Sequence, residues 1–200
     1  LDQRLAAWKL PCAANTKVGS FLNLEFPDDT FDAVWCSNAT EAFGIDDFVA
    51  ILNEFRRVVK PGGMVALKIC DFSSLVMYPM DPTFQWRRYD GRIRSGDTRH
   101  TTDQLMKPRN LRRWFERVGL SNVWQKSFVI ERWAPLGEGE RQFMSELLTM
   151  QAKEARDLEL SVVDLEYWRK MEDPSSSENP INDPDFHWAE THTVAVGRVG

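Results

Sequence analysis

Two short apolar runs flank a stretch with helical spacing in the first third of the chain. Residues 31–36 follow a Pro-Asp-Asp turn signal and read as a buried strand. From Asp46 onward one helical face is apolar, and basic residues stand at the end where the helix dipole favours them. The apolar positions are Phe48, Ile51, Leu52, Phe55, Val58 and Val59. The sequence 61–63, Pro-Gly-Gly, stops the helix, and 64–70 reads as a second buried strand. The pattern predicts two parallel strands joined by a right-handed helical crossover.

The later segments carry weaker but readable patterns. We expect helices at 1–10 and 108–118, strands at 16–21, 123–133 and 191–199, a long loop at 72–100, and a helical insertion within 134–189. The strand at 191–199 should lie antiparallel beside 64–70. The loop carries many aromatic and Met residues without clean periodicity, so it covers either a substrate or the sheet face as ordinary core.

Two motifs in the first third resemble the class I, Rossmann-like methyltransferases that use S-adenosylmethionine. Residues 24–32, Leu-Glu-Phe-Pro-Asp-Asp-Thr-Phe-Asp, match the segment that enters the family's fourth strand. Residues 57–63, Arg-Val-Val-Lys-Pro-Gly-Gly, match the end of the following helix. The resemblance implies an α/β fold with a Rossmann-like methyltransferase sheet, mostly parallel with an antiparallel last strand, and a helical insertion before that strand.

The same resemblance places the cofactor, S-adenosyl-L-methionine, at the carboxyl ends of the strands. It implies that Ser20, with Phe21 and Leu22 beside it, occupies the adenine-binding position, where the family usually has an Asp. A hydroxyl still accepts a hydrogen bond there, without the assistance of a charge; otherwise Ser20 is a plain turn residue. The segment Cys36, Ser37 and Asn38 would face the methionine part, although Asn38 also suits a helix N-cap.

Candidate substrate residues are Glu41 and Phe43 at the same mouth and His100 at the end of the 72–100 loop. Glu41 orients a substrate or is an ordinary surface carboxylate. His100 titrates near a substrate or is inert in a polar loop. We name no catalytic residue, because in-line methyl transfer can rely on positioning and desolvation of the nucleophile.

The amino-acid composition limits the kinds of partner and ligand that we expect for this protein. The net charge of −5 gives no basic footprint, so we expect no nucleic acid partner. The arginines of 87–99 form the one basic cluster, which we interpret as a solvated loop. No apolar run is long enough to span a membrane, and no secretory signal is seen, so we expect a cytoplasmic location. The three cysteines lack metal-ligand spacing, which predicts buried free thiols and no metal.

The family's glycine-rich first loop is not found in the sequence, and the chain begins with Leu1. We therefore expect 1–200 to be the C-terminal part of a single methyltransferase domain, with 72–100 and 134–189 covering the substrate. The expected function is methyl transfer to an oxygen, nitrogen or carbon atom of a small molecule. A non-catalytic module of methyltransferase ancestry is the main alternative, and a nucleotide-cofactor oxidoreductase is a weaker one.

Overall fold

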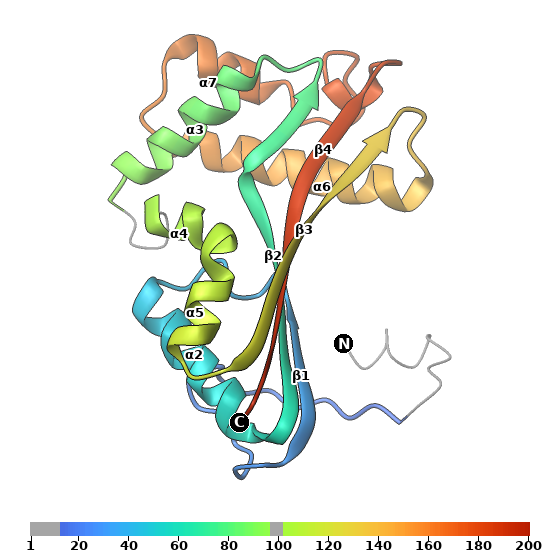
Figure 1. The fold of residues 1–200 in the computed structure, drawn as a ribbon. Coiled ribbons are helices and arrows are strands. Elements are labelled where there is room, and N and C mark those ends of the chain that lie inside the picture. Colours follow the sequence, from blue (N-terminus) through green and yellow to red (C-terminus); the bar gives the residue numbers. More distant parts are fainter. Residues whose placement is uncertain (1–12, 97–101) are drawn as a thin grey trace.

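The computed structural model describes residues 13–96 and 102–200, which build a four-stranded sheet in the order β1-β2-β4-β3 (Figure 1). The strands are β1 (Phe31–Ser37), β2 (Val59–Tyr78), β3 (Ser121–Trp133) and β4 (His187–Arg198). β1 pairs parallel with β2, with Cys36 opposite Leu67. β4 pairs antiparallel with β2 and places Ala195 on the other side of Leu67. Both predicted pairings are confirmed.

The prediction of a mostly parallel sheet is wrong. β4 lies between β2 and β3, and both of its pairings are antiparallel, so the sheet of the described residues contains one parallel pair. The expected strand at 16–21 is not formed either. This segment has only an isolated bridge between Ser20 and Asn23. The Phe21 ring instead packs edge-on against Phe43 and Phe55, which turns the segment towards the helical side.

The predicted crossover helix is α2 (Ile45–Val58), and it covers the lower half of the sheet in Figure 1. Its apolar face packs on β2 together with α5 (Leu111–Arg117). We call this cluster the lower core; its fully buried members include Phe48, Ile51, Leu52, Val65, Leu67, Ile69, Leu111, Phe115 and Ala195. The predicted helical face is therefore confirmed.

The Pro-Gly-Gly sequence lies inside β2, since the strand begins at Val59, directly after α2. The pairing with β1 shifts here, so five residues of β2 span two of β1. Gly62 has a φ of +79°, and a Cβ on Gly63 would lie 2.7 Å from the carbonyl oxygen of Asp32. The two glycines thus form a strand bulge that only residues without a side chain fit.

The prediction of a loop over 72–100 is wrong within the described residues. β2 continues to Tyr78 after an irregularity between Asp71 and Val76, and α3 (Pro82–Arg94) follows. Asp81 caps α3 by accepting a hydrogen bond from the Thr83 amide at 2.8 Å. The helix has little apolar periodicity because its buried face carries Gln85, Arg88 and Tyr89. The expected helix at 1–10 and His100 lie outside the described residues.

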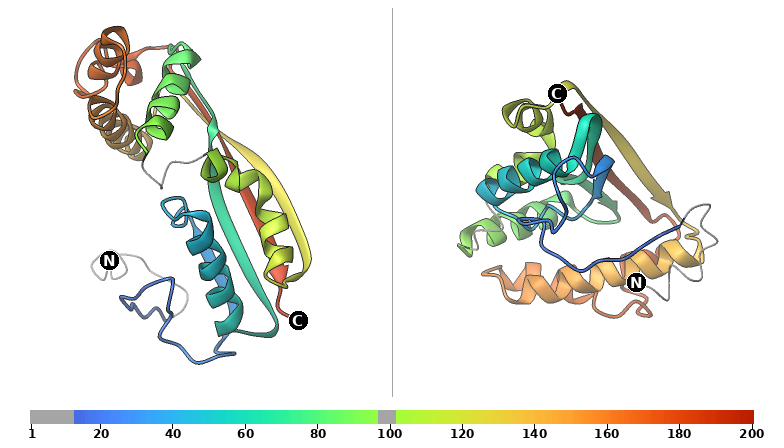
Figure 2. Two further views of the ribbon diagram at one scale, coloured as in Figure 1. Left: turned by 90° about the vertical axis from the view of Figure 1, so that its left-hand side faces the viewer. Right: turned by 90° about the horizontal axis from the view of Figure 1, so that it is seen from below.

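The helical insertion before the last strand is confirmed as α6 (Glu138–Arg156), α7 (Val162–Arg169) and the short η2 (Pro180–Asn182). With α3 they gather at the upper end of the sheet, away from α2 and α5 (Figure 2). We call their apolar cluster the upper core; it includes Met77, Met144, Leu148, Ala152, Trp168, Met171, Phe186 and Trp188. The short α4 (Thr102–Met106) and η1 (Lys107–Asn110) lead from the upper part to α5. No described helix is both long and apolar enough to cross a membrane.

Candidate functional site

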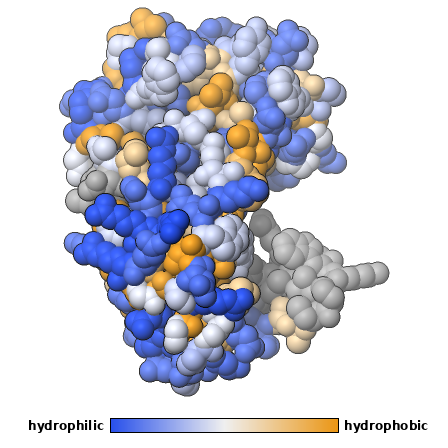
Figure 3. Space-filling view, in the orientation of Figure 1, coloured by the Kyte–Doolittle hydropathy of each residue, from blue (hydrophilic) through white to orange (hydrophobic). Residues whose placement is uncertain are grey.

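A cavity of about 460 Å³ lies where the upper helices meet the carboxyl end of the lower sheet. Figure 3 shows mainly hydrophilic side chains over this middle band of the molecule, with hydrophobic patches above and below it. Five segments line the cavity: the β1–α2 loop, β2, α3, the α4–η1 turn and α6. Their lining residues are Glu41, Ala42, Ile69, Cys70, Phe72, Arg88, Tyr89, Arg92, Ile93, Leu105, Lys107, Pro108, Leu147, Met150, Gln151 and Glu154. An apolar cavity with a few polar groups is the usual form of a small-molecule site.

Glu41 brings a carboxyl group to the cavity from the loop after β1. Its Oε1 accepts a long hydrogen bond, 3.4 Å, from the Cys70 amide, and burial raises its pKa. Its Oε2 is buried and has no hydrogen-bond partner among the described residues. Such an oxygen is available to a ligand that donates a hydrogen bond. Glu41 is therefore a wall of the cavity, not an ordinary surface carboxylate.

Lys107, at the start of η1, is fully buried beside the same loop. Its ammonium group donates to the carbonyl oxygens of Thr40 at 2.9 Å and Phe43 at 2.8 Å. Burial lowers the pKa of Lys107 to about 8, and the neighbouring Glu41 carboxylate partly opposes this shift. Lys107 thus fixes the loop that presents Glu41. Phe43 contributes its backbone to this contact, and its ring packs on Phe21.

The upper wall of the cavity carries a buried ion pair. Arg88 of α3 is 1% exposed and pairs with Glu154 of α6, while its guanidinium lies over the Trp168 ring. Arg92 also contacts Glu154, at 2.9 Å. Two described members of the basic cluster are therefore structural, and the prediction of a solvated loop is wrong for them. Because Arg88 and Glu154 come from segments 66 residues apart, sequence spacing gave no sign of the pair.

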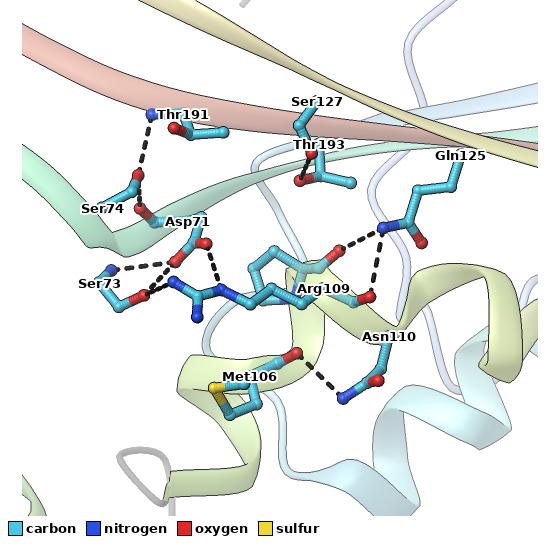
Figure 4. A network of polar contacts seen from close by, with 11 residues as sticks. Asp71, Ser73, Ser74, Met106, Arg109, Asn110, Gln125, Ser127, Thr191 and Thr193 are labelled. Atoms are coloured by element: carbon cyan, nitrogen blue, oxygen red, sulfur yellow. Dashed lines mark hydrogen bonds and ion pairs between the residues drawn. The ribbon is translucent and has the colours of Figure 1, made fainter.

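A polar network ties the irregular part of β2 to η1 (Figure 4). The Asp71 carboxylate accepts from Arg109 Nε at 2.9 Å, and Arg109 also donates to the Ser73 hydroxyl at 2.7 Å. Ser74 donates to the Asp71 carbonyl and accepts from the Thr191 amide of β4. These bonds hold the break in β2 directly after Cys70, and so they set the shape of the cavity floor.

The predicted cofactor residues fall into two groups. Cys36 and Ser37 end β1 at the edge of the sheet where β2 reaches Lys68, and Asn38 follows with a φ of +49°. The Asn38 amide donates to the Lys68 carbonyl at 2.9 Å, which holds it at this edge. Ser37 and Asn38 are exposed, whereas Cys36 is buried and its thiol pKa is raised to about 11 by burial and by Glu41. Asn38 does not cap α2, because Gly44 occupies the N-cap position.

Ser20, Phe21 and Leu22 form a turn instead of a strand end. The Ser20 hydroxyl oxygen accepts from the Leu22 amide at 3.2 Å, and its carbonyl accepts from Asn23. The Phe21 ring is partly buried against the lower core, while Leu22 is 41% exposed. Ser20 thus has the local bonds of a turn serine, and its hydroxyl can still offer one further contact.

A comparison of the sequence with protein families finds a match for the first third of the chain. A family model described as a methyltransferase domain matches residues 2–67. Over this segment the chain is similar to S-adenosylmethionine-dependent methyltransferases of class I. The matched segment ends inside β2, so the upper core and most of the cavity wall lie beyond it.

Curated relatives agree with this assignment. A demethylmenaquinone methyltransferase of Corynebacterium kroppenstedtii is 47% identical over 66 residues, which cover 33% of this chain and 25% of the relative. The enzyme of the same name from Staphylococcus saprophyticus is 33% identical over 129 residues, covering 56% of this chain and 51% of the relative. The chain thus spans between a quarter and about half of these relatives.

Among solved structures, phosphoethanolamine N-methyltransferase 2 of Haemonchus contortus, in complex with S-adenosyl-L-methionine, overlaps 90% of this chain and 36% of its own. The sequence identity is 13% and the TM-score is 0.43.

Proposed function

We propose that the protein transfers the methyl group of S-adenosylmethionine to an oxygen, nitrogen or carbon atom of a small molecule bound in the cavity. The proposal rests on the fact that the family-matched segment and the cavity adjoin each other in the fold. The segment that matches the methyltransferase family ends in β2, and Ile69, Cys70 and Phe72 of this strand, just beyond the matched segment and level with the carboxyl end of β1, line the cavity. Ligands of open α/β sheets bind at the carboxyl ends of the strands.

The polar groups at the end of β1 fit one part of this cofactor. Ser37 and Asn38 are exposed there and offer a hydroxyl and an amide, which suit the amino and carboxylate groups of a methionine moiety. When bound, the cofactor supplies an electrophilic methyl group and retains the electron pair of the broken carbon–sulfur bond. The described residues would hold its methionine end, with Ser20 as the candidate contact for the adenine.

The chain's own contribution is positioning and exclusion of water. Ile69, Phe72, Leu105 and Leu147 give the cavity apolar walls, which strip water from the nucleophile. Glu41 Oε2 accepts a hydrogen bond from the hydroxyl or amine of the substrate and orients it. For a nucleophile that must lose a proton, Glu41 is the acceptor within the cavity, because burial has already raised its pKa.

Calorimetric titration of the chain with S-adenosylmethionine and S-adenosylhomocysteine tests the proposal. We expect one saturable site for each compound. Asn38→Ala should weaken both, whereas Glu41→Gln should leave both affinities unchanged and lower the transfer rate to any accepted substrate. The exposed Ser175→Ala, far along the chain in the α7–η2 loop, is the matched control. A chain that binds neither compound would refute the proposal.

The second candidate, a non-catalytic module of methyltransferase ancestry, has one observation in its favour. Ser20 stands where the family's acidic adenine ligand is expected, and its hydroxyl already accepts a hydrogen bond from Leu22. Cofactor binding without methyl transfer to any compound of a broad panel of phenols, amines and quinols would favour that reading.

A further inference from the structure

Three side chains with metal-binding atoms meet on one face of the sheet, beside the cavity. Cys70 lies on β2, and Glu190 and His192 lie on β4, where His192 is paired directly opposite Cys70. All three residues are buried, with relative exposures of 4%, 5% and 5%. The Cys70 Sγ lies 3.7 Å from Glu190 Oε2, and His192 Nε2 lies 3.1 Å from Glu190 Oε1. One ligand atom from each of the three lies within 4.8 Å of the others.

The His192 ring is unusual for a buried histidine. Neither ring nitrogen has a hydrogen-bond partner among the described residues. The Nε2 atom is near Glu190, but the geometry is not that of a hydrogen bond, since the approach is too poorly aligned. Buried polar atoms in folded proteins are nearly always paired, and leaving one unpaired costs about 1–3 kcal/mol. We therefore expect the ring nitrogens of His192 to bind a group that the described residues do not supply.

We propose that Cys70, Glu190 and His192 bind a divalent cation of the Zn²⁺ type. A thiolate, an imidazole and a carboxylate form a donor set that Zn²⁺ accepts, and Co²⁺ can replace it. Zinc bonds of about 2.0–2.3 Å place tetrahedral ligand atoms about 3.3–3.8 Å apart. The sulfur–oxygen distance already falls in this range, and the imidazole ligand atom, which lies within 4.8 Å of the other two, needs a shift of no more than about 1 Å.

Arg132 completes the surroundings of the carboxylate. Its Nη1 donates to Glu190 Oε1 at 3.1 Å, and its guanidinium lies over the Phe143 ring. This leaves Oε2, the oxygen nearer to Cys70, for the cation. Outer partners of this kind commonly orient a ligating carboxylate. On binding, the Cys70 thiol releases its proton to solvent, so the dication meets a thiolate and a carboxylate.

Three protein ligands leave a fourth position open, as in catalytic zinc sites. Cys70 also lines the cavity, which gives the cation a path of entry and faces the fourth position towards a bound molecule. Sequence spacing could not reveal this set, because Cys70 and Glu190 are separated by 120 residues. The inference does not depend on the proposed methyl transfer.

The test uses the full chain, stripped of metal by a chelator and titrated with Zn²⁺ and with Co²⁺. We expect one tight equivalent of each, and the Co²⁺ form should show a thiolate charge-transfer band and intense tetrahedral d–d bands. Cys70→Ser should abolish the thiolate band. Cys70→Ser and Glu190→Gln should each weaken binding by more than about 100-fold, since loss of even an outer partner often costs 10–100-fold.

Cys36→Ser is the matched control, because Cys36 is another buried free cysteine, on β1 and outside the cluster. It should bind the metal as the unchanged chain does. Glu190→Gln keeps the size of the side chain, so it carries the test if Cys70→Ser does not fold. Binding that is weak and non-stoichiometric, or equal in the unchanged chain and Glu190→Gln, would overturn the proposal.

Discussion

The lower and upper cores share two strands of the sheet but are built in different ways. The lower core is a cluster of aliphatic and Phe residues from α2, β2 and α5. The upper core relies on Met and Trp, and beside it lie buried polar groups such as Arg88 and Gln151. On β4, Ala195 belongs to the lower core and Trp188 to the upper one. The two residues are seven positions apart (188 to 195), and because this number is odd their side chains point to opposite faces of the strand.

This difference explains where the cavity lies. The helices of the two cores gather at opposite ends of the sheet (Figure 2), and the cavity lies between them. The gap between them is closed by η1, Glu41 and the Arg88–Glu154 pair, and the cavity remains. The lower core thus supplies a rigid frame, while the upper core and its polar groups shape what binds.

The largest expected effect tests whether the two cores unfold together. Phe48→Ala in the lower core should lower the free energy of unfolding by about 3–5 kcal/mol, and Met144→Ala in the upper core by about 2–5 kcal/mol. Because β2 and β4 pass through both cores, we expect one cooperative transition in each variant. Urea unfolding, followed by Trp fluorescence and by far-UV circular dichroism, checks this. Val129→Ala, at a 64% exposed position, is the control. Two separate transitions would show that the cores are independent units.

The second prediction concerns the ion pair of the upper part. Arg88→Met should destabilise the fold by about 3 kcal/mol, because among the described residues it leaves the partly buried Glu154 paired with Arg92 alone. Arg94→Met, on the same helix, removes an exposed pair with Asp90 and should cost no more than about 0.5 kcal/mol. Thermal unfolding of the two variants provides the comparison. Equal losses would mean that burial does not distinguish the pairs.

The third prediction uses pH to probe the contact between the two regions. The pKa of Lys107 is about 8 in the fold and near 10.4 in the unfolded chain. Between these values the unfolded chain binds more protons, so this group makes stability rise with pH, by up to about 3 kcal/mol.

Lys107→Met should remove that rise, in addition to a loss at all pH values from the missing hydrogen bonds to the Thr40 and Phe43 carbonyls. Buried thiols contribute an opposite slope, so the measured quantity is the difference between the variant and the unchanged chain in urea unfolding from pH 7 to 11. The exposed Lys170→Met should leave the slope unchanged. Parallel curves for the unchanged chain and Lys107→Met would contradict the assignment.

The smallest effect concerns a helix cap of the upper part. The Ser161 hydroxyl accepts from the Asp164 amide at the start of α7, and α2 has no such side-chain cap. Ser161→Ala should therefore cost about 1 kcal/mol. Ser145→Ala, inside α6, should be neutral or slightly stabilising, because Ala favours the helix interior. Calorimetric melting of the two variants measures both changes in stability. No loss of stability in Ser161→Ala would show that α7 is held by packing alone.

Much of the sheet and of the lower core was predictable, because the sequence signals for these elements are local. The spacing of Phe48, Leu52 and Phe55 defines α2, and the flanking apolar runs define β1 and β2. The alternation after Thr191 predicted β4 and its antiparallel place. These patterns need only the periodicity of one element and the neighbouring turn residues.

The candidate site was predicted only in part. Glu41 was named, and it lines the cavity, whereas Lys107, Arg88 and Gln151 were not. A charged or amide side chain reads as exposed in a sequence, and its burial depends on a partner that a distant segment supplies. For the same reason the sequence did not predict α3, whose buried face is polar.

The sequence by itself determined the β1–α2–β2 unit, its resemblance to methyltransferases and the last antiparallel strand, because each follows from patterns within a few tens of residues. Only the tertiary structure decided that residues 16–21 form a turn and that Arg88 and Lys107 are buried. It also brought Cys70 beside Glu190 and His192. The physical reason is that burial and pairing of polar groups are properties of contacts between distant segments, and hydrophobic periodicity carries no record of those contacts.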